Sequence, residues 1–188
     1  MNKLQIGICG WGNVATGLFK TLETNQEEIK KRGNLQIEII VIGARRDNPK
    51  CDPGNVTIER DIFKVIDHDI DVVVELIGGV DVARDLIIRA LNAKKHVVTA
   101  NKAVIFSHGD ELFSVANKNG VKLLYESSVC AGTPIIKLLN QELAASKISK
   151  ISGMLNGTSN YILSNMEEGM EFEPTLKLAQ EKGYAEPD

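Results

Sequence analysis

Residues 4–19 read LQIGICGWGNVATGLF, and this stretch carries the strongest fold signal in the chain. Leu4 to Cys9 is an apolar run of strand length that leads through two closely spaced glycines into apolar residues at helical spacing. The helical spacing continues through a basic turn to a stop at Gly33. A strand, a glycine-rich turn and a helix in this order predict the first half of a βαβ unit.

The same alternation of strand and helix continues to about residue 125 and predicts an α/β fold, a Rossmann-like doubly wound parallel sheet. Further strands are expected at 35–42, near 56, and at 71–77, 96–99 and 121–125. Helices are expected over 61–67, over 82–93, and from a capping box at Ser107 and Asp110 to Asn119.

The pattern changes after residue 127, where the sequence predicts a domain boundary. Residues 1–127 are expected to form the Rossmann-like domain, and residues 128–188 the beginning of a second, α+β domain. In this second part we expect a helix near Pro134, a strand over 148–155 and helices over 158–168 and 174–182.

The glycine-rich turn, GWGNVA at 10–15, matches the dinucleotide fingerprint G-x-G-x-x-G/A in its required strand-to-helix context. The first glycine permits the tight turn, the second leaves room for the pyrophosphate, and the helix N-terminus faces the anion. The alternative is a glycine-rich turn without a ligand. The expected cofactor contacts of the turn are Gly10, Gly12, Asn13, Val14 and Ala15.

Two arginines follow the second strand, where NAD-specific folds place an acidic residue for the ribose 2′-hydroxyl. Arg45 and Arg46 suit the 2′-phosphate of NADP, because guanidinium groups make bidentate, charge-assisted contacts with phosphate. The alternative is that both are solvated loop residues and that Asp47 turns inward, which would favour NAD. We therefore expect NADP, with NAD possible.

Thr99-Ala100-Asn101-Lys102 lies just past the carboxyl end of a buried strand, where open α/β sheets bind their ligands. We expect Thr99 and Lys102 to contact the cofactor. A lysine beside a nicotinamide can also bind, or exchange a proton with, an oxygen that gains or loses hydride. The alternative for Lys102 is an ordinary surface lysine.

Several longer motifs, in this order along the chain, resemble those of homoserine dehydrogenases. They are ELIGG at 75–79, HVVTANKA at 96–103, YE at 125–126, GTPIIK at 132–137, LNGTSNYIL at 155–163 and GYAE at 183–186. The resemblance implies NAD(P)-linked interconversion of L-homoserine and L-aspartate 4-semialdehyde, in the biosynthesis of threonine and methionine. It also implies that residues 1–127 are an NAD(P)-binding domain and residues 128–188 the incomplete beginning of a substrate and dimerisation domain.

The resemblance also implies roles for individual residues. Lys102 is expected to be catalytic, Glu186 to bind the substrate's ammonium or hydroxyl, and Gly183 to contact the cofactor. A monovalent cation, expected to be Na⁺, is implied near the domain junction, and hard cations prefer oxygen ligands of this kind. Its matching residues are Glu126, Val129, Ala131 and Thr133.

The family pattern continues past the GYAE motif to an Asp-rich stretch and a lysine assigned as the principal proton donor or acceptor, whereas this chain ends at Asp188. We therefore expect a truncated chain with little turnover of its own, and a homodimer in the full-length protein. An alternative is a non-catalytic dinucleotide-binding sensor or assembly module. A third interpretation, a phosphorylating semialdehyde dehydrogenase, would need Cys130 as its nucleophile, but Cys130 lies in the cation motif.

The amino-acid composition limits the partners and the cellular compartment that we expect for this protein. Asp and Glu outnumber Lys and Arg 25 to 22, which argues against a nucleic-acid partner. The uncharged stretch 4–19 contains four glycines and is shorter than a membrane span, so no membrane association is expected. Three unpaired cysteines suit a reducing compartment, and we expect a cytoplasmic protein with a small-molecule substrate.

Overall fold

The fold was analysed in a computed structural model, which describes residues 2–185. The chain divides into two units, residues 1–136 and 137–188. Residues 128–136 stay with the first unit because the Glu126 carboxylate accepts a hydrogen bond from the Ile136 backbone N–H at 2.8 Å. The domain boundary expected after residue 127 lies nine residues before this division between the two units, and it stays a prediction.

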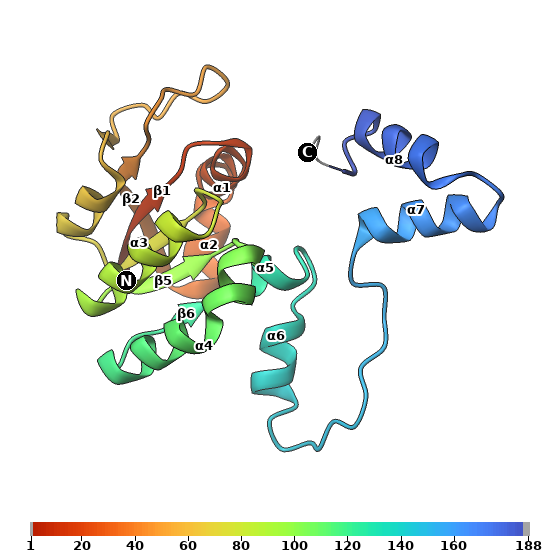
Figure 1. The fold of residues 1–188 in the computed structure, drawn as a ribbon. Coiled ribbons are helices and arrows are strands. Elements are labelled where there is room, and N and C mark those ends of the chain that lie inside the picture. Colours follow the sequence, from red (N-terminus) through yellow and green to blue (C-terminus); the bar gives the residue numbers. More distant parts are fainter. Residues whose placement is uncertain (1, 186–188) are drawn as a thin grey trace. The chain divides into compact units, whose positions relative to one another are not determined.

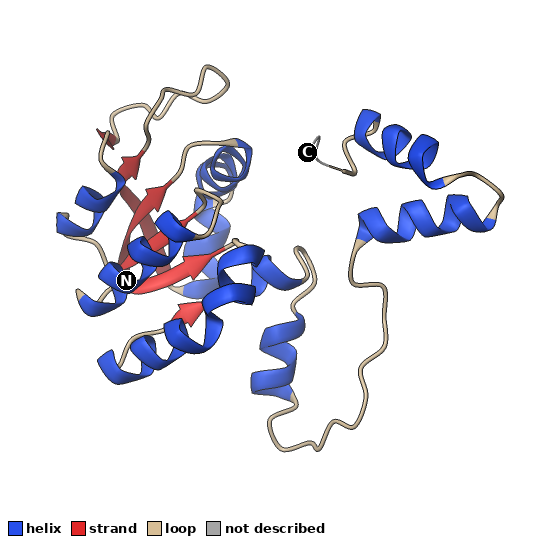
Figure 2. Cartoon of the chain, in the orientation of Figure 1, coloured by secondary structure: helices blue, strands red, loops and turns tan. Residues whose placement is uncertain are grey.

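The first unit contains one six-stranded sheet in which every paired strand is parallel, in the order β3-β2-β1-β4-β5-β6 (Figures 1 and 2). The predicted Rossmann-like fold is confirmed. The strands are β1 Asn2–Cys9, β2 Leu35–Gly43, β3 Thr57–Glu59, β4 Val72–Glu75, β5 His96–Thr99 and β6 Leu123–Leu124.

Helices pack on both faces of this sheet, which explains why its central strands are apolar nearly throughout. Along β4, Val73 belongs to the core formed with α3 and α4, whereas Val72 and Val74 face the core formed with α1. The helices of this unit are α1 Asn13–Thr24, α2 Gln26–Gly33, the 3₁₀ helix η1 Ile62–Asp67, α3 Asp81–Asn92, α4 Lys102–Asn119 and α5 Glu126–Val129.

The register of the strands places five carboxyl ends in one row. Cys9 of β1 pairs with Gly43 of β2 and with Glu75 of β4; Gly43 also pairs with Glu59, and Glu75 with Thr99. The segments that follow these five residues therefore begin at the same edge of the sheet. This is the edge at which open α/β sheets bind ligands.

Two helix predictions need correction. The helix expected to run unbroken to Gly33 is interrupted at Asn25, which separates α1 from α2. The helix expected to begin near Ser107 begins at Lys102, because the Asn101 side chain caps it and accepts a hydrogen bond from the Val104 N–H at 3.1 Å. The capping box predicted at Ser107 therefore lies inside α4, and the cap that is used stands next to the strand.

The second unit is helical in its described part. The helix α6 Ile135–Lys137 leads into it from the first unit, and the π-helix η2 Leu138–Glu142 follows. Helices α7 Gly157–Glu167 and α8 Phe172–Glu181 form a hairpin around Ile162, Thr175 and Ala179. The strand predicted over 148–155 is wrong: among the described residues this segment has no strand beside it to accept and donate ladder hydrogen bonds. No helix in residues 2–185 is both long and apolar enough to cross a membrane.

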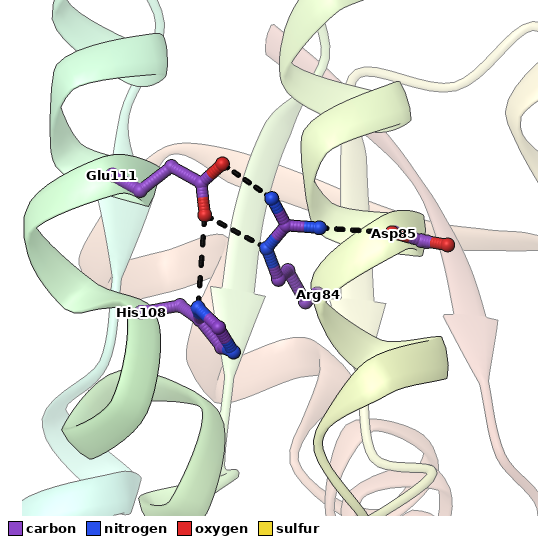
Figure 3. Close-up of polar contacts among 4 residues, drawn as sticks. All are labelled: Arg84, Asp85, His108 and Glu111. Carbon is purple, nitrogen blue, oxygen red and sulfur yellow. Dashed lines mark hydrogen bonds and ion pairs between the residues drawn. The ribbon is translucent and has the colours of Figure 1, made fainter.

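An ion-pair cluster joins α3 to α4 on the surface of the first unit (Figure 3). The Arg84 guanidinium binds both carboxylate oxygens of Glu111, at 2.5 and 2.7 Å, and His108 Nδ1 lies 3.7 Å from the same carboxylate. The hydrogen bond from Arg84 is the main reason that the pKa of Glu111 is lowered from its ordinary value of 4.5.

We expect Glu111→Gln to lower the melting temperature at neutral pH. Because the pKa of Glu111 is lowered in the folded protein, its stabilising contribution is complete above about pH 4.5 and is lost as the pH falls through the lower, folded-state value. The difference in Tm between wild type and variant should therefore shrink below that pH, and also at high salt. Thermal melts from pH 7 to pH 3 measure it, and a pH-independent difference would contradict the assignment.

Candidate functional site

A cavity of about 830 Å³ opens at the shared edge of the sheet, where the carboxyl ends of β1, β2 and β4 lie side by side. The segments that follow these strands and β3 form its walls. The lining residues are Gly10, Trp11, Gly12, Gly43, Ala44, Arg45, Arg46, Arg60, Asp61, Ile62, Phe63, Leu76, Ile77, Gly78 and Val82.

Gly10 shapes the turn that leaves β1. Its φ is +101°, and a Cβ at this position would lie only 2.5 Å from the backbone oxygen of Leu76. Its N–H donates to the Gly43 oxygen at 2.8 Å, which ties the turn to β2. Glycine is therefore required here by the fold itself.

Gly12 serves a different purpose from Gly10. A Cβ built on Gly12 meets no heavy atom within 4 Å, and the residue lies both in the cavity wall and at the N-terminus of α1. The unpaired backbone N–H groups of the first helical turn suit an anion. Of the other turn residues predicted to contact the cofactor, Asn13 and Val14 are exposed at the start of α1, whereas Ala15 is buried in the core.

Three arginines, rather than the two predicted, line the cavity beyond β2 and β3. Arg45 and Arg46 are exposed on the loop after β2, and Arg60 follows β3. The Arg60 guanidinium donates to the Ala44 oxygen at 3.2 Å and to the Asp47 carboxylate at 2.6 Å. Asp47 is thus paired with a cation and is not among the residues that line this cavity.

The sequence signals for these additional residues were weak. Arg60 and the apolar lining residues after β4 are separated in sequence from the glycine-rich turn and become its neighbours only through strand pairing. Glu75 was quoted only as part of the ELIGG motif, although an acidic residue directly after three valines was a signal that could have found it.

The Cys9 thiol lies near Glu75 and is buried. Burial, and secondarily the Glu75 charge, raises the pKa of the Cys9 thiol to about 12, so this buried cysteine stays protonated.

Thr99 and Lys102 lie at the same edge of the sheet, one strand further along. The Thr99 side chain is fully buried and donates a hydrogen bond to the Glu75 carboxylate at 2.5 Å. Lys102 is the exposed first residue of α4. Neither residue belongs to the lining of the 830 Å³ cavity.

The four residues predicted to hold a cation lie in one short segment of the first unit. Glu126 and Val129 bound α5, and a turn with Gly132 at φ +83° follows, in which the Thr133 N–H donates to the Cys130 oxygen at 2.8 Å. The Glu126 carboxylate closes the segment by binding the Ile136 N–H. The segment offers one carboxylate and backbone carbonyl groups, and oxygen atoms of both kinds suit a hard cation.

A second cavity, of about 500 Å³, lies within the second unit and brings two distant motifs together. Its lining consists of Gly157, Thr158, Asn160, Tyr161, Ser164 and Tyr184. The Thr158 hydroxyl donates to the backbone carbonyl oxygen of Tyr184. The rings of Tyr161 and Tyr184 meet edge to face, with centroids 5.1 Å apart. Gly183, at φ +73°, forms the turn before Tyr184. Glu186 lies outside the described residues.

Lys182 adds a cation beside the second cavity. Its ammonium lies 5.1 Å from the centroid of the Tyr161 ring, and a hydrogen bond with Tyr161 raises the lysine pKa. An apolar ring face, several hydroxyl groups and a nearby cation can together hold a small polar molecule.

Comparison with known proteins identifies the relatives of both units. Residues 10–126 match the model of the NAD-binding domain of homoserine dehydrogenase, and residues 134–188 match the homoserine dehydrogenase model. The homoserine dehydrogenase of Pseudomonas aeruginosa is 48% identical over 190 residues, which cover 100% of this chain and 44% of the relative. That of Helicobacter pylori is 42% identical and covers 98% of this chain and 44% of the relative.

Solved structures agree with these matches. A homoserine dehydrogenase from Thiobacillus denitrificans superposes with a TM-score of 0.92 at 40% identity, over 100% of this chain and 44% of that one. A hyperthermophilic archaeal homoserine dehydrogenase in complex with NADPH superposes with a TM-score of 0.82 at 25% identity, over 99% of this chain and 63% of that one. The chain thus spans under half of the curated relatives' length. Since the NAD-binding match alone spans more than half of the 188 residues, and its glycine turn and strand ends form the cavity described above, the chain belongs to the homoserine dehydrogenase family.

Proposed function

We propose that this chain binds NADPH and provides the cofactor site, and part of the substrate site, of an oxidoreductase that interconverts L-homoserine and L-aspartate 4-semialdehyde. One observation carries the proposal: the row of strand ends brings the open Gly12 turn and three arginines to a single cavity. The pyrophosphate would lie over Gly12 at the N-terminus of α1, and the adenosine half beside the loop after β2.

The residues present fit this cofactor. The space that a Cβ at Gly12 would fill is open, and Arg45 and Arg46 supply cations where a 2′-phosphate would lie. Arg60 pairs with Asp47, so a cation partly offsets the charge of this acidic side chain of the loop. The NADPH complex of the archaeal relative supports the same choice.

The bound nicotinamide would supply or accept the hydride, and the residues of this chain would hold the substrate and manage charge and protons. The Lys102 ammonium at the start of α4 would donate a hydrogen bond to the substrate oxygen as its charge develops. The second unit would contribute Glu186, which follows Gly183 by three residues in the sequence, for the substrate's ammonium or hydroxyl. The segment Glu126, Val129, Ala131 and Thr133 would bind Na⁺ through oxygen atoms.

The biological setting that we propose is that of the family. The reaction would serve the synthesis of threonine and methionine from aspartate, in a homodimer. All three cysteines are free, which suits a reducing compartment, and we propose the cytoplasm. The test of the activity is oxidation of NADPH in the presence of L-aspartate 4-semialdehyde by the complete gene product that contains these residues. Cofactor binding without turnover would favour a non-catalytic dinucleotide-binding module instead.

We expect the chain to bind NADPH more tightly than NADH, and Arg45→Ala and Arg46→Ala to reduce the preference. A charge-assisted contact with phosphate contributes about 1.5–3 kcal/mol, which corresponds to roughly 10- to 150-fold in affinity. Titration of both dinucleotides, with Lys50→Ala as the control on the same loop, measures the ratio. Equal affinities in the wild-type chain, unchanged in both variants, would refute NADP selectivity.

A further inference from the structure

Glu75 is a carboxylate that is fully buried in the first unit. It is the last residue of β4, follows three valines, and has 0% of its surface exposed. Removing a carboxylate from water is unfavourable unless other groups compensate it. The burial of this carboxylate therefore needs a structural or functional explanation.

Two hydrogen-bond donors compensate the carboxylate. One oxygen accepts the backbone N–H of Ile77 at 2.9 Å, and the other accepts the Thr99 hydroxyl at 2.5 Å. Both partners donate, so each needs an acceptor oxygen, and a carboxylate offers two. A glutamine would offer one acceptor and one donor, and would lose one of these contacts.

The two contacts belong to a chain of hydrogen bonds that the backbone from Glu75 to Gly79 closes into a ring. The Thr99 hydroxyl accepts the Asn101 backbone N–H at 3.0 Å, and the Asn101 amide donates to the Gly79 oxygen at 2.6 Å. Gly79 lies in the turn that starts at Glu75, so the ring joins this turn to the N-terminus of α4. The same Asn101 side chain caps α4 through Val104.

The turn after β4 is held at its start by the Leu76 N–H, which donates to the Cys9 oxygen at 2.8 Å, but its glycine end has little packing. Gly78 and Gly79 both have positive φ, +72° and +71°, and a Cβ on either would meet nothing within 4 Å. Packing around these two glycines is therefore sparse, and the hydrogen bonds from Glu75 and Asn101 hold both ends of the turn. Leu76, Ile77 and Gly78 of this turn line the cofactor cavity.

The ring lies on one side of the cavity. In a sheet of this strand order, the half with β1, β2 and β3 binds the adenosine side of a dinucleotide, and the half with β4, β5 and β6 binds the other mononucleotide. The Glu75 ring spans β4, β5 and the start of α4, where Lys102 is the first residue. It therefore lies in the nicotinamide half.

We propose that Glu75 is a positioning residue for the nicotinamide half of the cofactor site: through Thr99 and Asn101 it holds the turn after β4 and the start of α4, with Lys102, in one fixed arrangement. The proposal deepens the proposed function and rests on dinucleotide binding. It predicts that loss of the ring weakens the nicotinamide side of the cofactor and leaves the adenosine side unaffected.

The test compares two ligands on the 188-residue chain, NADPH and 2′,5′-ADP, which contains only the adenosine half with its 2′-phosphate. We expect Glu75→Gln and Thr99→Val to weaken NADPH about 10- to 100-fold, the effect of losing a hydrogen bond to a charged group, and to leave the affinity for 2′,5′-ADP unchanged. Thr99→Ser keeps the hydroxyl and should restore NADPH binding.

The matched control is Glu59→Gln. Glu59 also ends a strand, and its carboxylate lies 3.0 Å from His68 Nε2. This pair lies beside β3, outside the nicotinamide half. The ratio of the affinities for NADPH and 2′,5′-ADP should therefore not change. If Glu75→Gln fails to fold, the comparison of Thr99→Val with Thr99→Ser decides the question.

Three results would overturn the proposal. Variants that weaken both ligands equally would show a general structural role, and variants that weaken neither would show that the ring is dispensable. A serine at position 99 that binds NADPH as poorly as valine would show that the hydroxyl is not what matters. A wild-type chain that binds neither ligand would instead overturn the proposed function, and this inference with it.

Discussion

Lys102→Ala is expected to lower the rate of NADPH oxidation with L-aspartate 4-semialdehyde by about 10²- to 10⁴-fold, the range for loss of general acid-base assistance. Lys102 is exposed at the start of α4, on the edge of the sheet where the cofactor would bind. Its backbone position is held by the Asn101 cap rather than by its own side chain. The fold should therefore be preserved, whereas NADPH binding has to be measured, because Lys102 is itself an expected cofactor contact.

The measurement is steady-state turnover by the complete gene product that contains these 188 residues, with NADPH binding confirmed separately for each variant. Lys118→Ala, at the last turn of the same helix, is the control and should leave turnover unchanged. Full activity in Lys102→Ala would remove this residue from the mechanism. The 188 residues span 44% of the Pseudomonas aeruginosa relative, and we expect them alone to show little or no turnover; robust turnover would contradict that expectation.

Gly12→Val is expected to weaken dinucleotide binding by at least about 100-fold, because the added side chain would occupy the space left for the pyrophosphate. A Cβ at Gly12 meets no atom of the chain within 4 Å, and the backbone φ of −96° is accessible to any residue. The variant should therefore remain folded. Titration with NADPH, together with a circular dichroism spectrum, measures both expectations.

Gly10→Ala provides the contrast two residues earlier. There a Cβ would lie 2.5 Å from the Leu76 oxygen at a φ of +101°, so we expect a loss of stability on the order of 1–3 kcal/mol or more from backbone strain, before any effect on binding. Urea denaturation separates the two variants. Wild-type affinity in a folded Gly12→Val protein would refute the placement of the cofactor, and an unchanged denaturation midpoint in Gly10→Ala would refute the role of the turn.

The sequence alone predicted the elements whose signal is local. The strands β1, β2, β4 and β5 are apolar runs because helices pack on both faces of the sheet, although His96 and Val98 of β5 remain partly exposed, and the strand positions were predicted to within a few residues. The glycine-rich turn was recognised because one glycine must adopt a positive φ and another must leave space. The long motifs were sufficient to indicate the family, which the comparisons confirm.

The tertiary structure decided everything that depends on distant neighbours. Asn101 and Ser107 are both acceptable helix caps by composition, and Asn101 is used because β5 ends at Thr99 and the Gly79 oxygen lies within reach of its amide. The strand predicted over 148–155 fails because a strand needs a partner for its backbone hydrogen bonds, and apolar residues alone do not supply one.

In the candidate site, too, some residues could be predicted from local sequence and others only from the pairing of strands. Arg45 and Arg46 could be predicted because they follow a strand directly, but Arg60 joins them only because Glu59 pairs with Gly43 in the sheet. The role of Glu75 depends on Thr99, 24 residues away in sequence but adjacent to it in the register. Local sequence determines where each strand ends, whereas only the pairing of the strands determines which of those ends meet, and the candidate site is built from ends that meet.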